Sequence, residues 1–260
     1  GFTVRRLDLA TGNLSFVAGS FRGPLAITGN STDLYILDPA TYGNPIGHAQ
    51  QFWLSPALIR RISLATGEVY TLPLPLAQTG PDFDPGGLWS DDQFLYLTFF
   101  SRQGTVALGR MRLDSFEFTP LSGFPIAVTS ETRYFPRSLW SDGQGNFYFA
   151  EGKNIRRFVL STGEVSFVAS LPPAMENVVG GLSGSGDSLV ATDSTASVVV
   201  EINATTGVVR TLAGLAYNVP SATEDIRPMK GATGLWRQGQ FFYVIDDTHS
   251  VIHRIAADTF

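Results

Sequence analysis

Short stretches of alternating apolar and polar residues, each interrupted by a Thr-Gly pair, recur along the chain. Residues 58–72, LIRRISLATGEVYTL, show the pattern most clearly, with β-branched and apolar runs on both sides of the pair. Two such runs separated by a glycine-containing turn are typical of a β-hairpin. The pattern returns at 4–19, 155–170 and 199–214, and in altered form at 109–121 and 251–260, where Phe116 and Phe260 replace the glycine.

A second repeated phrase lies between the hairpins and supplies two more strands to each unit. It consists of an apolar strand, a turn rich in Gly, Asp, Asn and Ser, and an aromatic or β-branched strand. The hairpins recur every 44 to 55 residues, a period typical of stacked units that are too small to bury their own faces. The second phrase occurs at 24–38, 87–99, 138–151, 181–193 and 234–246.

The fold predicted from this pattern is all-β, a β-propeller of four-stranded blades. No stretch shows apolar residues sustained at i, i+3, i+4 and i+7, so helices are expected to be scarce. The chain opens on a third strand and stops before a fourth, which favours six blades with incomplete ends; five blades are the alternative. We expect residues 1–260 to form a single domain, and the start on Gly1 points to processing or excision from a longer chain.

Several phrases resemble the NHL repeat, a β-propeller family, with SMP-30 and strictosidine-synthase-like propellers as more distant relatives. They are VRTLAG at 209–214, NLSFVAG at 13–19 and IRRISLATGEVYTL at 59–72. The resemblance covers nearly the whole chain and implies a propeller fold. The chain departs from the repeat in its third unit, which lacks the IRR phrase, and at Thr98 and Phe99, where the repeat has an acidic residue.

Composition and charge argue against several classes of partner. The 18 Lys and Arg residues against 23 Asp and Glu residues give a net charge of −5, whereas a general nucleic-acid surface needs a basic excess. No apolar run approaches the roughly 20 residues of a membrane span. Cysteine is absent, so disulfides cannot form. Paired arginines at equivalent third-strand positions are expected to be solvated or structural: Arg5 and Arg6, Arg60 and Arg61, and Arg156 and Arg157.

Three N-x-S/T sequons, the acceptor motif for N-glycosylation, begin at Asn13, Asn30 and Asn203. Asn13 and Asn203 flank Thr-Gly corners and Asn30 lies in an inner turn, all places where a sugar could project into water. Turns also favour asparagine for conformational reasons alone. The sequons favour a secreted or cell-surface glycoprotein, with a cytoplasmic location as the alternative.

A long loop at 39–57 carries Tyr42, His48, Phe52 and Trp53. Aromatic residues on a loop held by a rigid scaffold form a candidate contact surface. The alternative is that Phe52 and Trp53 extend a strand and pack inward. Crossover loops, rich in Pro and Gly, are expected at 72–86, 124–137, 171–180 and 215–233.

The repeat places an acidic residue at the end of the second strand in four units: Asp38, Glu151, Asp193 and Asp246. One interpretation is a ring of carboxylates that binds Ca²⁺. The favoured one is structural, with each carboxylate capping a turn by accepting hydrogen bonds from backbone N–H groups.

Trp89, Trp140 and Trp236 share one position of the first strand, with Ser183 and Ala26 in the other two units. Packing between blades is the favoured role, and sugar stacking is the alternative.

No catalytic set can be assembled from the sequence. His249 and His253 lie four residues apart, which on a strand separates them by about 14 Å, too far to share a metal. HExxH, P-loop and G-x-S-x-G motifs are absent. We therefore predict a non-catalytic interaction or structural module that binds a protein partner or its own copies through face loops. The alternatives are a metal-dependent lactonase- or lyase-like propeller enzyme and a glycan-binding propeller.

Overall fold

The computed structural model describes residues 2–39, 57–72, 83–101, 106–124, 138–173, 175, 179–193, 196–214, 229, 231–246 and 248–256. The aromatic loop residues Tyr42, His48, Phe52 and Trp53 lie outside these ranges, as do most of the crossover loops.

Every regular element in the described part of the chain is a β-strand, as the alternating pattern predicts. The described residues accordingly include no helix long and apolar enough to cross a membrane. The strands are β1 (Phe2–Leu7), β2 (Leu14–Phe21), β3 (Ala26–Gly29), β4 (Asp33–Pro39), β5 (Ala57–Ser63), β6 (Val69–Leu72), β7 (Phe83–Ser90), β8 (Phe94–Ser101), β9 (Val106–Arg112), β10 (Phe118–Phe124), β11 (Leu139–Ser141), β12 (Asn146–Glu151), β13 (Asn154–Val159), β14 (Glu164–Ser170), β15 (Val179–Ser185), β16 (Ser188–Asp193), β17 (Val198–Asn203), β18 (Val209–Gly214), β19 (Ala232–Gln238), β20 (Phe241–Asp246) and β21 (Val251–Ala256).

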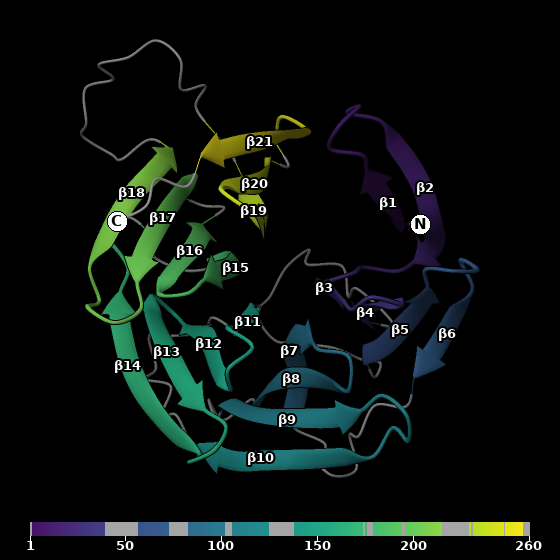
Figure 1. Cartoon of the computed structure of the whole chain (residues 1–260), viewed down its shortest axis with the longest axis horizontal. Helices are drawn as coiled ribbons and strands as arrows, with labels where there is room; N and C mark the ends of the chain where they lie inside the picture. The colour runs from purple at the N-terminus through teal and green to yellow at the C-terminus, as the bar shows by residue number, and fades with distance from the viewer. Residues whose placement is uncertain are drawn as a thin grey trace, which may run out of the picture. The chain divides into compact units, whose positions relative to one another are not determined.

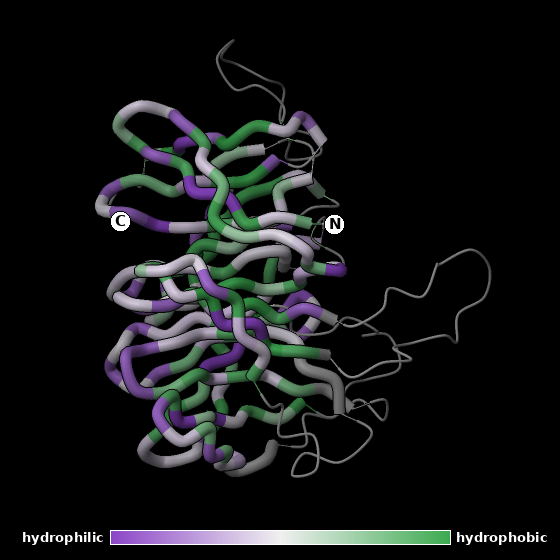
Figure 2. Tube along the Cα trace, turned by 90° about the vertical axis from the view of Figure 1, so that its right-hand side faces the viewer, coloured by the Kyte–Doolittle hydropathy of each residue, from purple (hydrophilic) through white to green (hydrophobic). Residues whose placement is uncertain are grey.

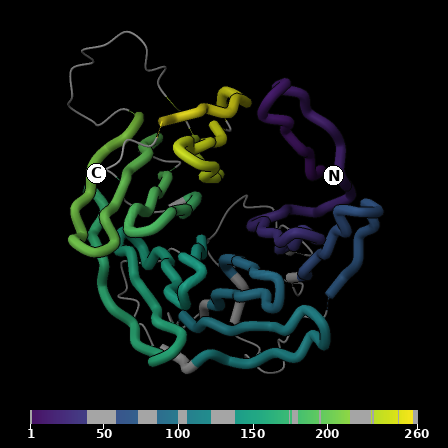
Figure 3. The backbone as a smooth tube through the Cα atoms, viewed as in Figure 1, coloured from purple at the N-terminus to yellow at the C-terminus, as the bar shows by residue number. Residues whose placement is uncertain are grey.

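The strands pair with their neighbours in chain order to form separate sheets (Figures 1 and 3). Four sheets are complete: β3–β6, β7–β10, β11–β14 and β15–β18. Within the described residues the last sheet, β19–β21, has three strands, and the first, β1–β2, has two. Five sheets therefore contain the inner pair of strands, which agrees with the five-blade alternative and not with the favoured six blades. Within the described residues the first and last sheets are incomplete, as the order of the sequence phrases predicts.

The chain forms two compact units, residues 1–101 with 108–120 and residues 102–107 with 121–260.

The Thr-Gly corners close the hairpins through a left-handed residue. Gly67 has a φ of 74° and its N–H donates to the carbonyl of Ser63 at 2.8 Å. Glycine adopts this conformation without the steric cost that a Cβ adds. In the altered copy, Phe116 takes the same place with a φ of 58° and donates to the carbonyl of Arg112 at 3.0 Å. The corner geometry therefore survives the loss of its glycine.

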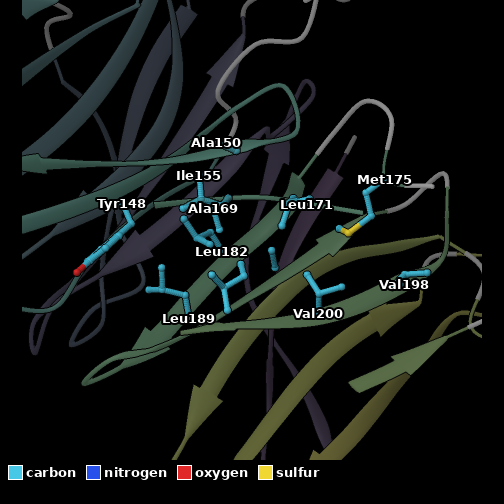
Figure 4. Packing of buried hydrophobic residues seen from close by; sticks show 12 residues of the cluster. Tyr148, Ala150, Ile155, Ala169, Leu171, Met175, Leu182, Leu189, Val198 and Val200 are labelled. Carbon is cyan, nitrogen blue, oxygen red and sulfur yellow. The ribbon is translucent and has the colours of Figure 1, made fainter. Parts of the chain in front are cut away.

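Successive sheets pack through apolar side chains that alternate along the strands. Figure 2 shows hydrophobic stretches along the strands and hydrophilic ones at many of the turns. One cluster joins β11–β14 to β15–β18 and includes Ile155, Leu189 and Val200, all fully buried (Figure 4). Because β15–β18 has a neighbouring sheet on each face, its two inner strands are apolar on both sides.

Candidate functional site

Three of the acidic residues near the ends of the second strands, Asp38, Asp193 and Asp246, bind backbone N–H groups. Asp38, at the end of β4, is buried, and its Oδ1 accepts hydrogen bonds from the N–H groups of Arg22 (2.9 Å) and Gly23 (3.0 Å). Asp193, at the end of β16, accepts one from the N–H of Ala196 at 2.8 Å. A buried carboxylate that accepts backbone hydrogen bonds holds a turn in place. This is the structural role that the sequence favours.

Thr98 lies within β8, one residue before Phe99, which the register makes equivalent to Glu151. Its hydroxyl accepts a hydrogen bond from the N–H of Gly87 at 2.7 Å. Among the described residues, no group of three or more His, Cys, Asp or Glu side chains is arranged to hold a metal ion. Calcium binding by Asp38, Glu151, Asp193 and Asp246 stays a prediction.

In three sheets the same acidic residue also contacts a basic side chain of the third strand. The basic residues occupy equivalent positions, because each one pairs with the second-strand residue that lies two positions before the acid. Arg60 and Arg156 place a positive charge beside a buried carboxylate, which offsets part of the cost of burying it. The arginines of the repeated IRR phrase are therefore structural in these sheets. The pairs are Arg60–Asp38 (3.9 Å), Arg156–Glu151 (2.7 Å) and His253–Asp246 (3.3 Å).

A second ion pair in the first complete sheet predicts an acid-sensitive contribution to stability. Burial raises the pKa of Asp33, but hydrogen bonds from Arg61 and Thr32 and the charge of Arg61 together lower it below the usual value of 3.8. Arg61 binds both carboxylate oxygens at 2.8 Å. A carboxyl whose pKa is lower in the folded state stabilises the fold above its unfolded pKa, and this stabilisation disappears as the pH falls through the folded pKa.

We therefore expect Asp33→Asn to unfold at a lower urea concentration than the unmodified protein at pH 7. The gap between their unfolding free energies should shrink as the pH falls below about 3.8. Urea titrations from pH 7 to pH 2.5 would measure it. Asp187→Asn, in an exposed turn, is the control, and a gap that does not change with pH would contradict the prediction.

The two histidines near the end of the chain converge on one carboxylate. His249 Nδ1 lies 2.8 Å and His253 Nε2 lies 3.3 Å from the same oxygen, Oδ2 of fully buried Asp246. The expectation that these histidines lie about 14 Å apart is wrong, because it assumed an extended strand. His249 lies in the turn that precedes β21, where the chain folds back toward Asp246.

The three tryptophans lie at one register position of the first strand, which we call the Trp slot. Each pairs across the sheet with a tyrosine of the second strand. The register corrects one assignment: Thr28 fills the slot in β3, because it pairs with Tyr35, whereas Ala26 pairs with Leu37. A shift of two residues keeps the same face of a strand, so alternation alone cannot detect it. The pairs are Trp89–Tyr96, Trp140–Tyr148 and Trp236–Tyr243.

Trp140 packs between sheets, which is the role favoured by the sequence. It lies against the cluster that joins its sheet to β15–β18. A Cβ added to Gly184 of β15 would lie only 3.0 Å from Cη2 of Trp140. Glycine therefore makes room for the indole. Trp236 differs, because 66% of its surface is exposed.

We call the face of a sheet that carries the Trp slot and its cross-strand partners its leading face, and the opposite side its trailing face. In β19–β21 the leading face carries Trp236, Tyr243, Ile245, Ile252 and Arg254. Ile245 and Ile252 are 46% and 44% exposed. Exposed apolar side chains that adjoin one another are typical of a contact surface.

The same positions are covered in an inner sheet. Ala150 and Ile155 of β12 and β13 correspond to Ile245 and Ile252, because each pair lies directly across the sheet. Ala150 is 5% exposed and Ile155 is fully buried against β15–β18. The leading face of β19–β21 therefore has the pattern of a buried face, yet Trp236, Ile245 and Ile252 on it are exposed. It is the candidate functional site among the described residues.

The three sequon asparagines differ in their exposure and in the hydrogen bonds that their side chains make. Asn13 is exposed at the β1–β2 corner. Asn30 is partly buried, its Oδ1 accepts hydrogen bonds from the N–H groups of Thr32 and Asp33, and its Nδ2 donates to the carbonyl of Asp91 at 3.4 Å. Asn203 accepts hydrogen bonds from the N–H groups of Thr205 and Thr206.

Comparisons with known proteins bear on the fold. No protein-family model and no curated protein matches the chain. A chain in the crystal structure of a nidogen/laminin complex is similar over 98% of this chain and 86% of that one, with a TM-score of 0.68 and 15% identity. The extracellular domain of the putative one-component system BT4673 from B. thetaiotaomicron is similar over 88% of this chain and 27% of its own length, with a TM-score of 0.55 and 13% identity.

The NHL repeat itself stays a prediction. Together with the sequential antiparallel order of the sheets, the structural likeness shows that the chain has an all-β propeller fold built from four-stranded blades.

Proposed function

We propose that the protein is a non-catalytic interaction module that binds another protein, and that the leading face of β19–β21 contributes to the binding surface. The observation that carries the proposal is the exposure of Trp236, Ile245 and Ile252 on one face. Large apolar and aromatic side chains that a partner can desolvate supply most of the binding energy at protein interfaces.

Two further observations support the proposal. The buried carboxylates at the ends of β4 and β16 bind backbone N–H groups, which is a structural use of these side chains. The nidogen/laminin structure places a chain of similar fold in a complex between proteins. The face loops predicted as contact surface would add to the leading face of β19–β21.

A capture experiment with a matched control tests the proposed function. Proteins from extracellular fluid would be cross-linked to the purified chain, and the partner so identified would be purified and titrated by calorimetry. Ile252→Asp is expected to weaken its binding by at least about 30-fold, as loss of an interface hot spot does. Val208→Asp, at an exposed corner, is the control. Equal affinity of both variants would contradict a role for the leading face.

We also propose that the protein is a secreted or cell-surface glycoprotein. The sequons support this, and the similar domain of BT4673 is described as extracellular. When the chain is expressed in eukaryotic secretory cells, we expect a glycan on Asn13 and none on Asn30. The amide of Asn30 is tied to Asp91, whereas the corner at Asn13 faces water.

Mass spectrometry before and after glycosidase treatment would measure the occupancy of each sequon. Asn13→Gln should remove most of the mass lost on deglycosylation. Higher occupancy at Asn30 than at Asn13 would show that the folded geometry does not govern modification.

Trp236 favours glycan binding as a second candidate function. Its ring is the most exposed of the three Trp-slot indoles, and an exposed indole is a stacking surface. Titration with neutral oligosaccharides would then change tryptophan fluorescence in the unmodified protein and not in Trp236→Ala.

A further inference from the structure

Two histidines contact Asp246 at the end of β20, where two other sheets have a single arginine beside the acid. His249 Nδ1 lies 2.8 Å and His253 Nε2 lies 3.3 Å from the same carboxylate oxygen, Oδ2. The other oxygen, Oδ1, accepts a hydrogen bond from the backbone N–H of His249 at 3.0 Å. All three residues belong to β20, β21 and the turn between these strands. The cluster is therefore complete within one sheet.

The equivalent contacts in β3–β6 and β11–β14 use a permanent charge. Arg60 lies 3.9 Å from Asp38, and Arg156 lies 2.7 Å from Glu151. Arginine stays protonated in proteins, whereas histidine is the side chain that ordinarily changes its charge between about pH 5 and 8. The last sheet therefore has a titratable side chain where these two sheets have a fixed positive charge.

Protonation of the two rings strengthens their contacts with Asp246. A neutral imidazole carries a proton on one nitrogen only, so each ring donates to the carboxylate in just one tautomer, whereas a charged ring carries a proton on both nitrogens. Hydrogen bonds between ionised groups are shorter than neutral ones and about twice as strong. Because Asp246 has no exposed surface, a positive ring beside it also offsets part of the cost of burying the carboxylate.

Both rings reach water although the carboxylate does not. The side chain of His249 is 45% exposed and that of His253 is 22% exposed, against 0% for Asp246. The rings can therefore gain and lose protons without opening of the sheet.

The other described charged side chains around this cluster have partners of their own. In β19–β21, Arg237 and Arg254 lie over phenylalanine rings. On the leading face of β15–β18, which packs against the trailing face of β19–β21, Arg210 binds Glu201. Asp193 caps its own turn. Among the described side chains around Asp246, only histidine is of a type that ordinarily changes its charge between about pH 5 and 8.

The turn between β20 and β21 contains a strained residue. Ser250 has a φ of 54°, a left-handed conformation that is uncommon for residues other than glycine. In the turn between β12 and β13 the left-handed residue is Gly152, with a φ of 56°, and glycine adopts this conformation without steric cost. Opening of the β20–β21 turn therefore releases strain, and side-chain contacts are needed to keep this turn closed.

We propose that Asp246, His249 and His253 form a pH-sensitive latch, which holds β21 and the turn before it against β20 more firmly at pH 5.5 than at pH 8. The stabilisation is present while the rings are charged, and it is lost as the pH rises through the range in which histidine titrates. Asp246 and His253 lie on the face opposite Ile245 and Ile252. The latch is therefore separate from the proposed binding surface.

Hydrogen exchange of backbone amides reports the opening of individual strands. It would be measured by NMR at pH 5.5 and pH 8 and corrected for the intrinsic exchange rate at each pH. We expect the amides of β21 to be at least about five-fold more protected at pH 5.5, because hydrogen bonds to charged groups are stronger than neutral ones. The amides of β13 are the internal control, since Arg156 keeps its charge at both pH values, and their protection should not change.

Two variants separate the histidines from other effects of pH. His253→Arg introduces the residue that β13 has at the equivalent position, and it should raise the protection of β21 at pH 8 toward the value at pH 5.5. The double variant His249→Gln/His253→Gln should leave β21 equally weakly protected at both pH values. Circular dichroism checks that both variants keep their strands. A pH effect in β21 that is no larger than in β13, or one that persists in the double variant, would overturn the latch.

Discussion

Ile155→Ala is expected to lower the free energy of unfolding by about 2–5 kcal/mol, the cost of emptying a fully buried aliphatic site. Ile155 has no exposed surface and packs where β11–β14 meets β15–β18. Its neighbours in that cluster belong to strands of both sheets, so the cavity cannot collapse without moving one sheet against the other. Urea-induced unfolding followed by tryptophan fluorescence measures the change.

Ile252→Ala is the matched control, because Ile252 occupies the same position in β19–β21. With 44% of its surface exposed, truncation removes less buried area and leaves no closed cavity. We expect a loss below about 1 kcal/mol for this variant. Equal losses at the two positions would show that the leading face of the last sheet is covered in solution.

Glu201→Ala is expected to lower the free energy of unfolding by about 2–3 kcal/mol, less than the full cost of breaking a buried ion pair because Arg210 can still reach water. Glu201 is 1% exposed. It accepts hydrogen bonds from Arg210 Nε (2.8 Å) and Nη2 (2.6 Å) and from the hydroxyl of Ser188 (2.5 Å). Removing the carboxylate leaves both donors without this acceptor, and chemical denaturation measures the cost.

Asp114→Ala tests whether an exposed ion pair with a strongly shifted pKa contributes to the stability of the fold. Arg112 donates a hydrogen bond to Asp114 and lowers its pKa to about 2, but both side chains are largely exposed. Exposed ion pairs contribute little to stability because water and salt screen them. The urea midpoint of this variant is expected to match that of the unmodified protein. A drop comparable to that of Glu201→Ala would contradict the argument from burial.

Local patterns were enough to predict the strands and their corners. The Thr-Gly pair at 66–67 closes β5 and β6 because a left-handed residue is needed there, and glycine supplies it. Asp193 could be predicted as a cap because it ends a strand, and it binds the N–H of Ala196 three residues later. These features depend on residues close in sequence, or on a repeat that shows the same pattern several times.

Two kinds of prediction failed because they depend on the path of the chain: the distance between two side chains, and the matching of strand positions from one unit to the next. The spacing of His249 and His253 gave a distance that the turn before β21 shortens. The assignment of Ala26 to the Trp slot failed because strand alternation is blind to a shift of two residues. The sequence did hold one indication that a histidine contacts Asp246. His253 occupies the third-strand position at which other units have an arginine that pairs with the acid.

By itself, the sequence determined that this is a repeated all-β chain with four-stranded units, because alternation and turn residues act over a few positions. Only the tertiary structure decided which faces are covered. Ile155 and Ile252 have the same pattern around them, yet one is buried and the other is exposed, because burial depends on whether another sheet lies against that face. The candidate surface is defined by the exposure of Trp236, Ile245 and Ile252, which the alternation of residues along a strand does not determine.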